Sequence, residues 1–143
     1  MLVSTKGRYA LRVLIDMAEH QSEDYIPVKE IAQRQERSEK YLESIVKMLV
    51  KGGILTGLRG KGGGYRLSRP PEQYTVWDVL HLTEGSLAPV SCLEEDAAPC
   101  IRQGECRTLA MWRGLNRTIE EYLERFTIED LMQTEAPGDY YVI

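Results

Sequence analysis

The chain of 143 residues is 43% hydrophobic and 28% charged, as in an ordinary soluble globular protein. Its start is too polar for a signal peptide and no run is long enough to cross a bilayer, so we expect a cytoplasmic protein without membrane contact. The net charge is −4, yet residues 1–70 carry 13 Lys and Arg against 8 Asp and Glu, whereas residues 71–143 carry 5 against 14. This asymmetry predicts a DNA-facing N-terminal part and a non-contacting C-terminal part.

The first predicted element is an amphipathic helix through residues 9–18, with Ser4 or Thr5 as its N-cap. A second helix is expected from Pro27 to residue 35 and a third from Ser38, a good N-cap, to Lys51. The third helix has an apolar face and an outer polar face, as a recognition helix presents to the major groove. These two short helices predict a helix-turn-helix.

A basic hairpin follows the helix-turn-helix. Two short apolar strands, 54–56 and 65–67, flank the glycine-rich residues 58–64, which contain Arg59 and Lys61. A phosphate-binding P-loop would need Ser or Thr after its Lys and a helix next, and neither is present here. A flexible tip without function is the simpler alternative. The position directly after the helix-turn-helix favours a wing, with Arg59 suited to a narrow minor groove.

Two further helices and a short last one are predicted downstream of the wing. Thr75 and Asp78 resemble a capping box for residues 76–82, where His81 is interpreted as structural because one helical His is weak evidence of a site. A long helix from Cys106 carries a narrow apolar seam, which favours a symmetric dimer of paired helices. The seam consists of Leu109, Trp112, Leu115, Ile119, Tyr122 and Phe126. Thr127 and Asp130 are expected to cap the short helix 128–132.

The three cysteines, Cys92, Cys100 and Cys106, lie between these helices or at the start of the long one. A structural disulfide would leave one thiol over and is not expected in a reducing compartment. Cys106 at a helix N-terminus would favour a thiolate, and gathered thiolates need a cation, which leaves an iron–sulfur cluster or zinc. The spacing lacks the Cys-x-x-Cys pairs usual for zinc, but spacing alone leaves both open.

The fold class is therefore mainly α with a small β-hairpin wing: a winged helix-turn-helix followed by a long C-terminal dimerisation helix. We predict three parts: a DNA-binding domain (1–70), a linking helix with the cysteine loop (71–105), and a dimerisation helix with a C-terminal tail (106–143). An enzyme is not expected, because a thiol or metal enzyme needs a base near its nucleophile and the two histidines are remote from the cysteines in sequence.

Several motifs together resemble the family of winged-helix transcription regulators that contains IscR, NsrR and CymR. They are residues 2–10 (LVSTKGRYA), 31–35 (IAQRQ), Ser38-x-x-Tyr41-Leu42-Glu43, 59–65 (RGKGGGY), the three cysteines, and 110–112 (AMW). The resemblance covers nearly the whole chain. It implies a homodimer on a pseudo-palindromic promoter site and an iron–sulfur cluster on the three cysteines, [2Fe–2S] in preference to [4Fe–4S]. The cluster would sense cluster supply, redox state or nitric oxide.

Residue by residue, the resemblance places Tyr41, Glu43 and Ser44 on the reading face and Arg59 in the minor groove. The full set of expected DNA-binding residues is Lys6, Ser38, Lys40, Tyr41, Glu43, Ser44, Lys47, Arg59, Gly60 and Lys61. By resemblance, IscR-type members have a Cys-x-x-His arrangement after the third cysteine, and the position of that His is Leu109 here. NsrR-type members use an acidic residue near the N-terminus of the partner subunit, and the nearby position here is Arg8. The fourth ligand is therefore unassigned. An NsrR-type nitric oxide sensor, or the same fold with zinc or free thiols, are the alternatives.

Overall fold

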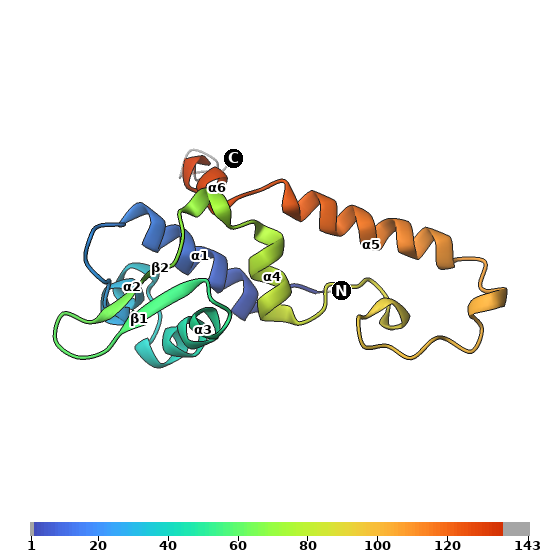
Figure 1. Cartoon of the computed structure of the whole chain (residues 1–143), viewed down its shortest axis with the longest axis horizontal. Helices are drawn as coiled ribbons and strands as arrows, with labels where there is room; N and C mark the ends of the chain where they lie inside the picture. The colour runs from blue at the N-terminus through green and yellow to red at the C-terminus, as the bar shows by residue number, and fades with distance from the viewer. Residues whose placement is uncertain (1, 136–143) are drawn as a thin grey trace, which may run out of the picture.

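The computed structural model describes residues 2–135, and its architecture confirms the predicted fold class (Figure 1). The described part holds six α-helices and one two-stranded antiparallel hairpin, in which Leu55 pairs with Leu67 and Leu58 with Gly64. None of these helices is long and apolar enough to span a membrane. The elements are α1 (Thr5–Glu19), α2 (Val28–Gln35), α3 (Glu39–Lys51), β1 (Leu55–Leu58), β2 (Gly64–Leu67), α4 (Val76–Glu84), α5 (Leu109–Glu124) and α6 (Ile128–Gln133).

Local capping chemistry defines where most helices begin. Ser4 caps α1 and Ser38 caps α3, each accepting a backbone N–H through its hydroxyl, as the sequence predicts. The two predicted capping boxes, at the starts of α4 and α6, are both present. Pro27 was expected as the first residue of α2, but it is the N-cap, with extended backbone, and the helix begins at Val28.

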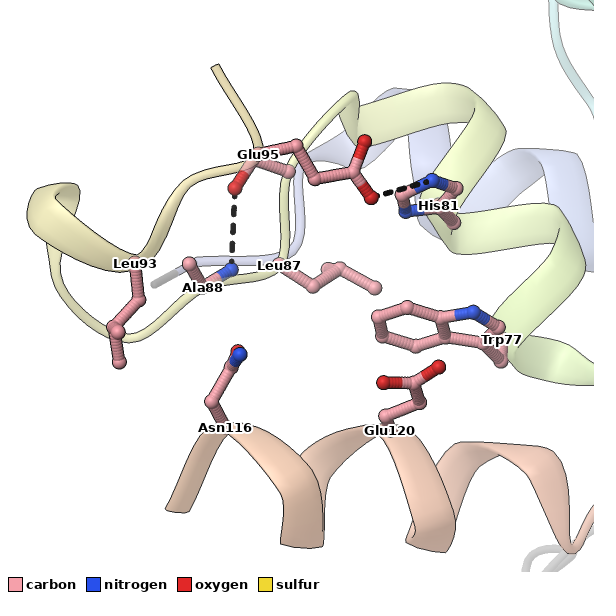
Figure 2. A pocket seen from close by; sticks show the side chains of 9 residues that line it. Trp77, His81, Leu87, Ala88, Leu93, Glu95, Asn116 and Glu120 are labelled. Atoms are coloured by element: carbon pink, nitrogen blue, oxygen red, sulfur yellow. Dashed lines mark hydrogen bonds and ion pairs between the residues drawn. The ribbon is translucent and has the colours of Figure 1, made fainter. Parts of the chain in front are cut away.

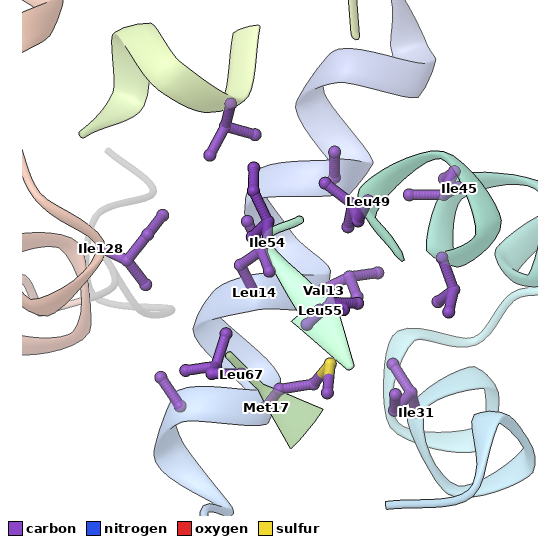
Figure 3. Packing of buried hydrophobic residues seen from close by; sticks show 14 of the residues in the cluster. Val13, Leu14, Met17, Ile31, Ile45, Leu49, Ile54, Leu55, Leu67 and Ile128 are labelled. Carbon is purple, nitrogen blue, oxygen red and sulfur yellow. The ribbon is translucent and has the colours of Figure 1, made fainter. Parts of the chain in front are cut away.

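The main hydrophobic core surrounds α1, which contacts α2, α3, α4, α6 and the hairpin. Side chains from all these parts of the chain interdigitate there (Figure 3). The residues shown include Val13, Leu14 and Met17 of α1, Ile31 of α2, Ile45 and Leu49 of α3, Ile54, Leu55 and Leu67 of the hairpin, and Ile128 of α6. The predicted apolar face of α3 is thus the buried one, and its polar face points outward.

Helix α6 belongs to this core although it is the last element of the described chain. Ile128 is fully buried, Thr127 forms a β-bridge with Thr75, and the backbone N–H of Val76 donates to the carbonyl of Phe126 at 2.8 Å. The chain therefore returns to the N-terminal domain after α5. The predicted division at residues 70 and 105 stays a prediction, and the tail beyond residue 135 lies outside the described residues.

Helix α5 lies apart from α1, α2 and α3 and runs from the outlying cysteine loop back to α6 (Figure 1). It begins at Leu109, whereas the sequence predicted a start at Cys106. Residues 103–105 form a 3-10 turn instead, and Cys106 follows it with extended backbone. Thr108 is the N-cap residue of α5. No residue of α5 is fully buried within the single chain.

Candidate DNA interface and cysteine loop

The recognition helix α3 is fixed by its buried face and presents a polar surface. Leu42, Ile45, Val46 and Leu49 are completely buried. On the other side, Lys40, Ser44 and Lys47 are exposed, and Tyr41 and Glu43 are half-buried. The Ser44 hydroxyl donates to the Tyr41 carbonyl at 2.6 Å, so its oxygen can still accept a bond from a base or an amide. The helix-turn-helix geometry thus leaves the predicted reading residues accessible.

The N-terminus of α3 forms a hollow together with the start of α1. Ser38 and Tyr41, both predicted, line it with Thr5, Glu36 and Arg37, which were not predicted from the sequence. The Arg37 guanidinium lies 4.5 Å over the Tyr9 ring and donates to the Tyr9 hydroxyl. A helix N-terminus beside an arginine is suited to a phosphate group. The signal for Arg37 was present, since it directly precedes the N-cap of a recognition helix.

The wing is a tight glycine turn between two strands. Gly60 and Gly62 have positive φ of 92° and 76°, and the Gly63 N–H closes the turn on the Gly60 carbonyl at 3.0 Å. The turn holds Arg59 and Lys61 in exposed positions at its tip. A shallow cavity of about 290 Å³ separates the wing from α3, with Lys47 on one wall and Arg59 on the other.

The basic residues predicted to contact DNA are not engaged in ion pairs within the described part of the chain. Among residues 2–135, none of the five forms an ion pair with a carboxylate, since the ion pairs present involve His20, Arg34 and His81. The five are Lys6, Lys40, Lys47, Arg59 and Lys61. Unpaired cations on one side of a helix-turn-helix provide the electrostatic attraction that brings a protein to the DNA backbone.

The three cysteines lie in an exposed loop, residues 86–106, which we call the cysteine loop. Cys92, Cys100 and Cys106 all line one small cavity of about 60 Å³, together with Leu109 and Arg113 of α5. They do not converge closely: within residues 2–135 no three His, Cys, Asp or Glu side chains are grouped as metal ligands. The structure brings the predicted ligands to one cavity but does not assemble a site.

Cys106 differs chemically from the other two thiols. Its Sγ lies 3.5 Å from the Thr108 Oγ1, and the backbone N–H groups of Thr108 and Leu109 also approach the sulfur. These hydrogen bonds, that of the Thr108 hydroxyl first, stabilise the thiolate and lower the pKa of Cys106. The predicted thiolate preference is therefore present, although Cys106 lies before the helix instead of at its first turn.

A second cavity, of about 150 Å³, lies where α4, the cysteine loop and α5 meet (Figure 2). His81 and Trp77 of α4 stack with ring centroids 5.1 Å apart, and the His81 Nε2 lies 3.3 Å from the Glu95 Oε1 of the loop. Asn116 and Glu120 of α5 form the opposite wall. The cysteine loop is thus connected to α4, which itself packs against α1.

The outer side of α5 is apolar and uncovered in the single chain. Met111 is 56% exposed, Leu115 41% and Tyr122 52%. Met111 and Leu115 are four residues apart and Tyr122 lies seven residues further on, so the three share one face. The predicted seam is only partly on this face, because Phe126 packs against a small core formed by Val76, Leu80 and Leu87.

A helix-turn-helix followed by a basic hairpin, with an exposed reading helix, defines a winged-helix DNA-binding transcription regulator. The family model "Rrf2: Iron-dependent Transcriptional regulator" matches residues 3–134. The chain belongs to the Rrf2 family, which confirms the resemblance to IscR and CymR regulators. Proteins of this kind regulate transcription and are not enzymes.

Individual relatives are similar over nearly the full length. Protein rrf2 of Nitratidesulfovibrio vulgaris is 40% identical over 93% of this chain and 88% of its own. Among solved structures, CymR of B. subtilis, described as the global cysteine regulator, has a TM-score of 0.74 at 35% identity and covers 94% of this chain and 99% of that one. T. potens IscR has a TM-score of 0.70 at 32% identity and covers 99% and 96%.

Proposed function

We propose that the protein acts as a homodimer that binds a pseudo-palindromic promoter site and that its three cysteines hold an iron–sulfur cluster, which reports cluster supply, redox state or nitric oxide. The observation that carries the sensing part is that Cys92, Cys100 and Cys106 line one cavity at the start of the helix with the uncovered apolar face. The loop leads directly into α5, so a change in the loop can shift this helix. Helix α5, as the proposed dimer contact, is suited to set the distance between two DNA-binding domains.

The proposed DNA contacts are those predicted from the sequence, from Lys6 and Ser38 through α3 to the wing, with Thr5 and Arg37 added. Ser38, Tyr41, Thr5 and Arg37 share the hollow at the α3 N-terminus, suited to a phosphate. Lys40, Glu43, Ser44 and Lys47 face outward along α3, suited to the major groove. The two domains of a dimer would present these surfaces to two half-sites.

Replacing Arg59 with Ala tests the wing contact. We expect a loss of about 1–3 kcal/mol of binding free energy, or about 5- to 150-fold in Kd, because a lost specific contact has that size. The measurement is a titration at fixed salt of a DNA duplex that the wild-type protein has selected from random sequences. Arg117→Ala removes the same charge from the exposed side of α5 and serves as the control. Equal affinities for the Arg59 and Arg117 variants would contradict the wing assignment.

The chemistry of the residues fits an iron–sulfur cluster. Three thiols line one cavity, and hydrogen bonds favour the thiolate of Cys106, the form that ligates metals. Cys92, Cys100 and Cys106 would hold the cluster, [2Fe–2S] in preference to [4Fe–4S], with a fourth ligand that is not a cysteine of this chain. Such a cluster supplies a redox- and ligand-sensitive centre when bound. Zinc at the same thiols, or an NsrR-type nitric oxide response, are variants of the same proposal.

A second candidate function is sensing by the free thiols themselves. The exposure of all three cysteines and the lowered pKa of Cys106 favour it, because exposed thiolates are the ones that oxidants modify. In this case the cysteine loop changes through modification of sulfur atoms and requires no metal.

Alkylation kinetics of the metal-free protein test the chemistry common to both candidates. We expect iodoacetamide to modify Cys106 faster than Cys92 and Cys100 at neutral pH, since a lowered pKa gives a larger thiolate fraction, and the ratio of the rates should fall as pH rises and all three thiols ionise. Peptide mass spectrometry at timed intervals measures the three rates. Thr108→Val, which removes the first of the hydrogen bonds, should slow Cys106 toward the other two. Equal rates for the three thiols in the wild type would contradict the assignment of Cys106 as the activated thiol.

A further inference from the structure

We infer that α4 transmits the state of the cysteine loop to the DNA-facing end of α1 within a single subunit. His81 and Glu95 form the connection to the loop, and Glu84 and Ser4 form the connection to α1. These four residues are positioning residues: they touch neither the proposed cluster ligands nor the proposed base contacts. The inference rests on the proposed function, because it concerns how the sensing loop reaches the DNA-binding domain.

The connection to the loop is a single polar contact. Among the hydrogen bonds and ion pairs of residues 2–135, one joins the cysteine loop to α4, and it is the 3.3 Å pair between His81 and Glu95. Apart from it, Leu87 fastens the beginning of the loop by packing with Val76 and Leu80. The Glu95 side chain is 73% exposed, so the pair is weak. A weak contact suits a connection that is made in one loop conformation and broken in another.

The geometry around His81 directs its ring toward the loop. Stacking on Trp77, with 19° between the planes, orients the imidazole, and its Nδ1 is buried without a hydrogen-bond partner among the described residues. The Nε2 is therefore the nitrogen that faces the loop, where the Glu95 Oε1 is its ion-pair partner. Glu120 of α5 is the other charged group that lines this cavity (Figure 2).

The connection to α1 is made three residues further along α4. The Glu84 Oε1 accepts the Ser4 backbone N–H at 3.1 Å and the Ser4 hydroxyl at 2.7 Å, while the Ser4 Oγ accepts the Gly7 N–H at 3.1 Å. Gly7 allows the two helices to touch: a Cβ there would collide with the Glu84 Oε1 and lie 3.1 Å from the Thr83 Oγ1. Glu84 therefore holds the N-cap of α1, and the first turn of that helix carries Thr5 and Lys6.

Because His81 and Glu84 are less than one turn apart on one helix, a displacement of the first acts on the second. When the cysteine loop rearranges on cluster loss or thiol modification, the Glu95–His81 contact breaks, α4 loses its hold on the loop, and the Ser4 N-cap loosens. Both conformations exist in the metal-free chain, and the loop state changes their populations. The DNA-facing end of α1 then becomes less ordered.

Hydrogen exchange in the metal-free protein tests this coupling directly. In Glu95→Ala, which removes the ion pair with His81, we expect the amides of a peptide covering residues 3–10 to exchange at least twofold faster than in the wild type. Glu84→Ala removes the contact with Ser4 itself, so its exchange rate in this peptide is the largest that loss of the contact can cause. Glu94→Ala removes an exposed carboxylate beside Glu95 and should leave the exchange rates of residues 3–10 at their wild-type values. Faster exchange confined to the cysteine loop in Glu95→Ala would overturn the inference.

A DNA-binding comparison separates this inference from the proposed function. The Kd for the selected duplex is measured for the cluster-reconstituted form and for the metal-free form of each variant. The ratio of these two Kd values should lie at least twofold closer to one in Glu95→Ala than in the wild type. A wild-type ratio of one contradicts the proposed cluster sensing, and hydrogen exchange then still decides the coupling. If the wild-type ratio differs from one and Glu95→Ala does not change it, the coupling is overturned and the proposed function stands.

Discussion

Leu115→Glu should convert the proposed dimer to a monomer at micromolar concentration. Leu115 is 41% exposed in the single chain and lies between Met111 and Tyr122 on the uncovered face of α5. In a two-fold dimer one substitution introduces two buried carboxylates, and burying unpaired charge costs several kcal/mol. We expect the dissociation constant of the dimer to rise by roughly 100-fold or more, since about 1.4 kcal/mol is a factor of ten. Analytical ultracentrifugation over a range of concentrations measures it.

Ala110→Glu provides the matched control for this experiment. It adds the same carboxylate to the same helix, on the side away from Leu115, where Ala110 is exposed. This variant should remain dimeric. A Leu115 variant that sediments as a dimer with the wild-type dissociation constant would place the interface elsewhere and contradict the proposed role of α5.

Asp16→Ala should lower the free energy of unfolding by about 2–3 kcal/mol. Asp16 is the buried charged residue of the core region, 4% exposed, and accepts from the Arg34 Nη2 at 2.7 Å and from the Gln35 Nε2 at 3.1 Å. The same contact raises the pKa of Arg34. Removing one partner of a buried pair leaves the other uncompensated, and the full cost of about 3–5 kcal/mol is reduced here because Arg34 is 29% exposed.

Urea unfolding at one fixed protein concentration measures this loss, since the stability of the proposed dimer would depend on concentration. Glu30→Ala is the control: Glu30 is 56% exposed and its contact with Arg34 is 3.8 Å long, so we expect a change below about 0.5 kcal/mol. Equal stabilities of the Asp16 and Glu30 variants would show that the pair does not fasten α2 to α1.

The features that could be predicted from the sequence are those set by neighbouring residues. The caps at Ser4 and Ser38 and both capping boxes depend on three or four consecutive residues, and the buried face of α3 follows from its helical repeat. The two short helices and the basic hairpin together predicted the winged helix, and the family match confirms it. The proposed DNA contacts remain predictions, although the structure leaves them exposed.

The features that could not be predicted depend on contacts between distant segments. The Asp16–Arg34 pair joins residues 18 positions apart, and Glu84 reaches Ser4 across 80. The return of α6 to the core depends on Ile128 fitting beside α1, for which its short helix gives no local signal. The start of α5 was placed too early because the residues after Cys106 have no helix-breaking residue, while the thiol itself takes the free N–H groups near Thr108.

The most direct test of the central claim is anaerobic reconstitution with iron and sulfide, followed by visible absorption and quantification of bound iron and sulfide. The wild type is expected to become coloured and to bind both elements. Cys92→Ala, Cys100→Ala and Cys106→Ala should each lose them while keeping the far-ultraviolet circular dichroism of the fold, because the three cysteines are exposed and lie outside the core. A wild-type protein that takes up neither element, or three variants that all retain the wild-type content, would contradict the assignment of these cysteines as cluster ligands.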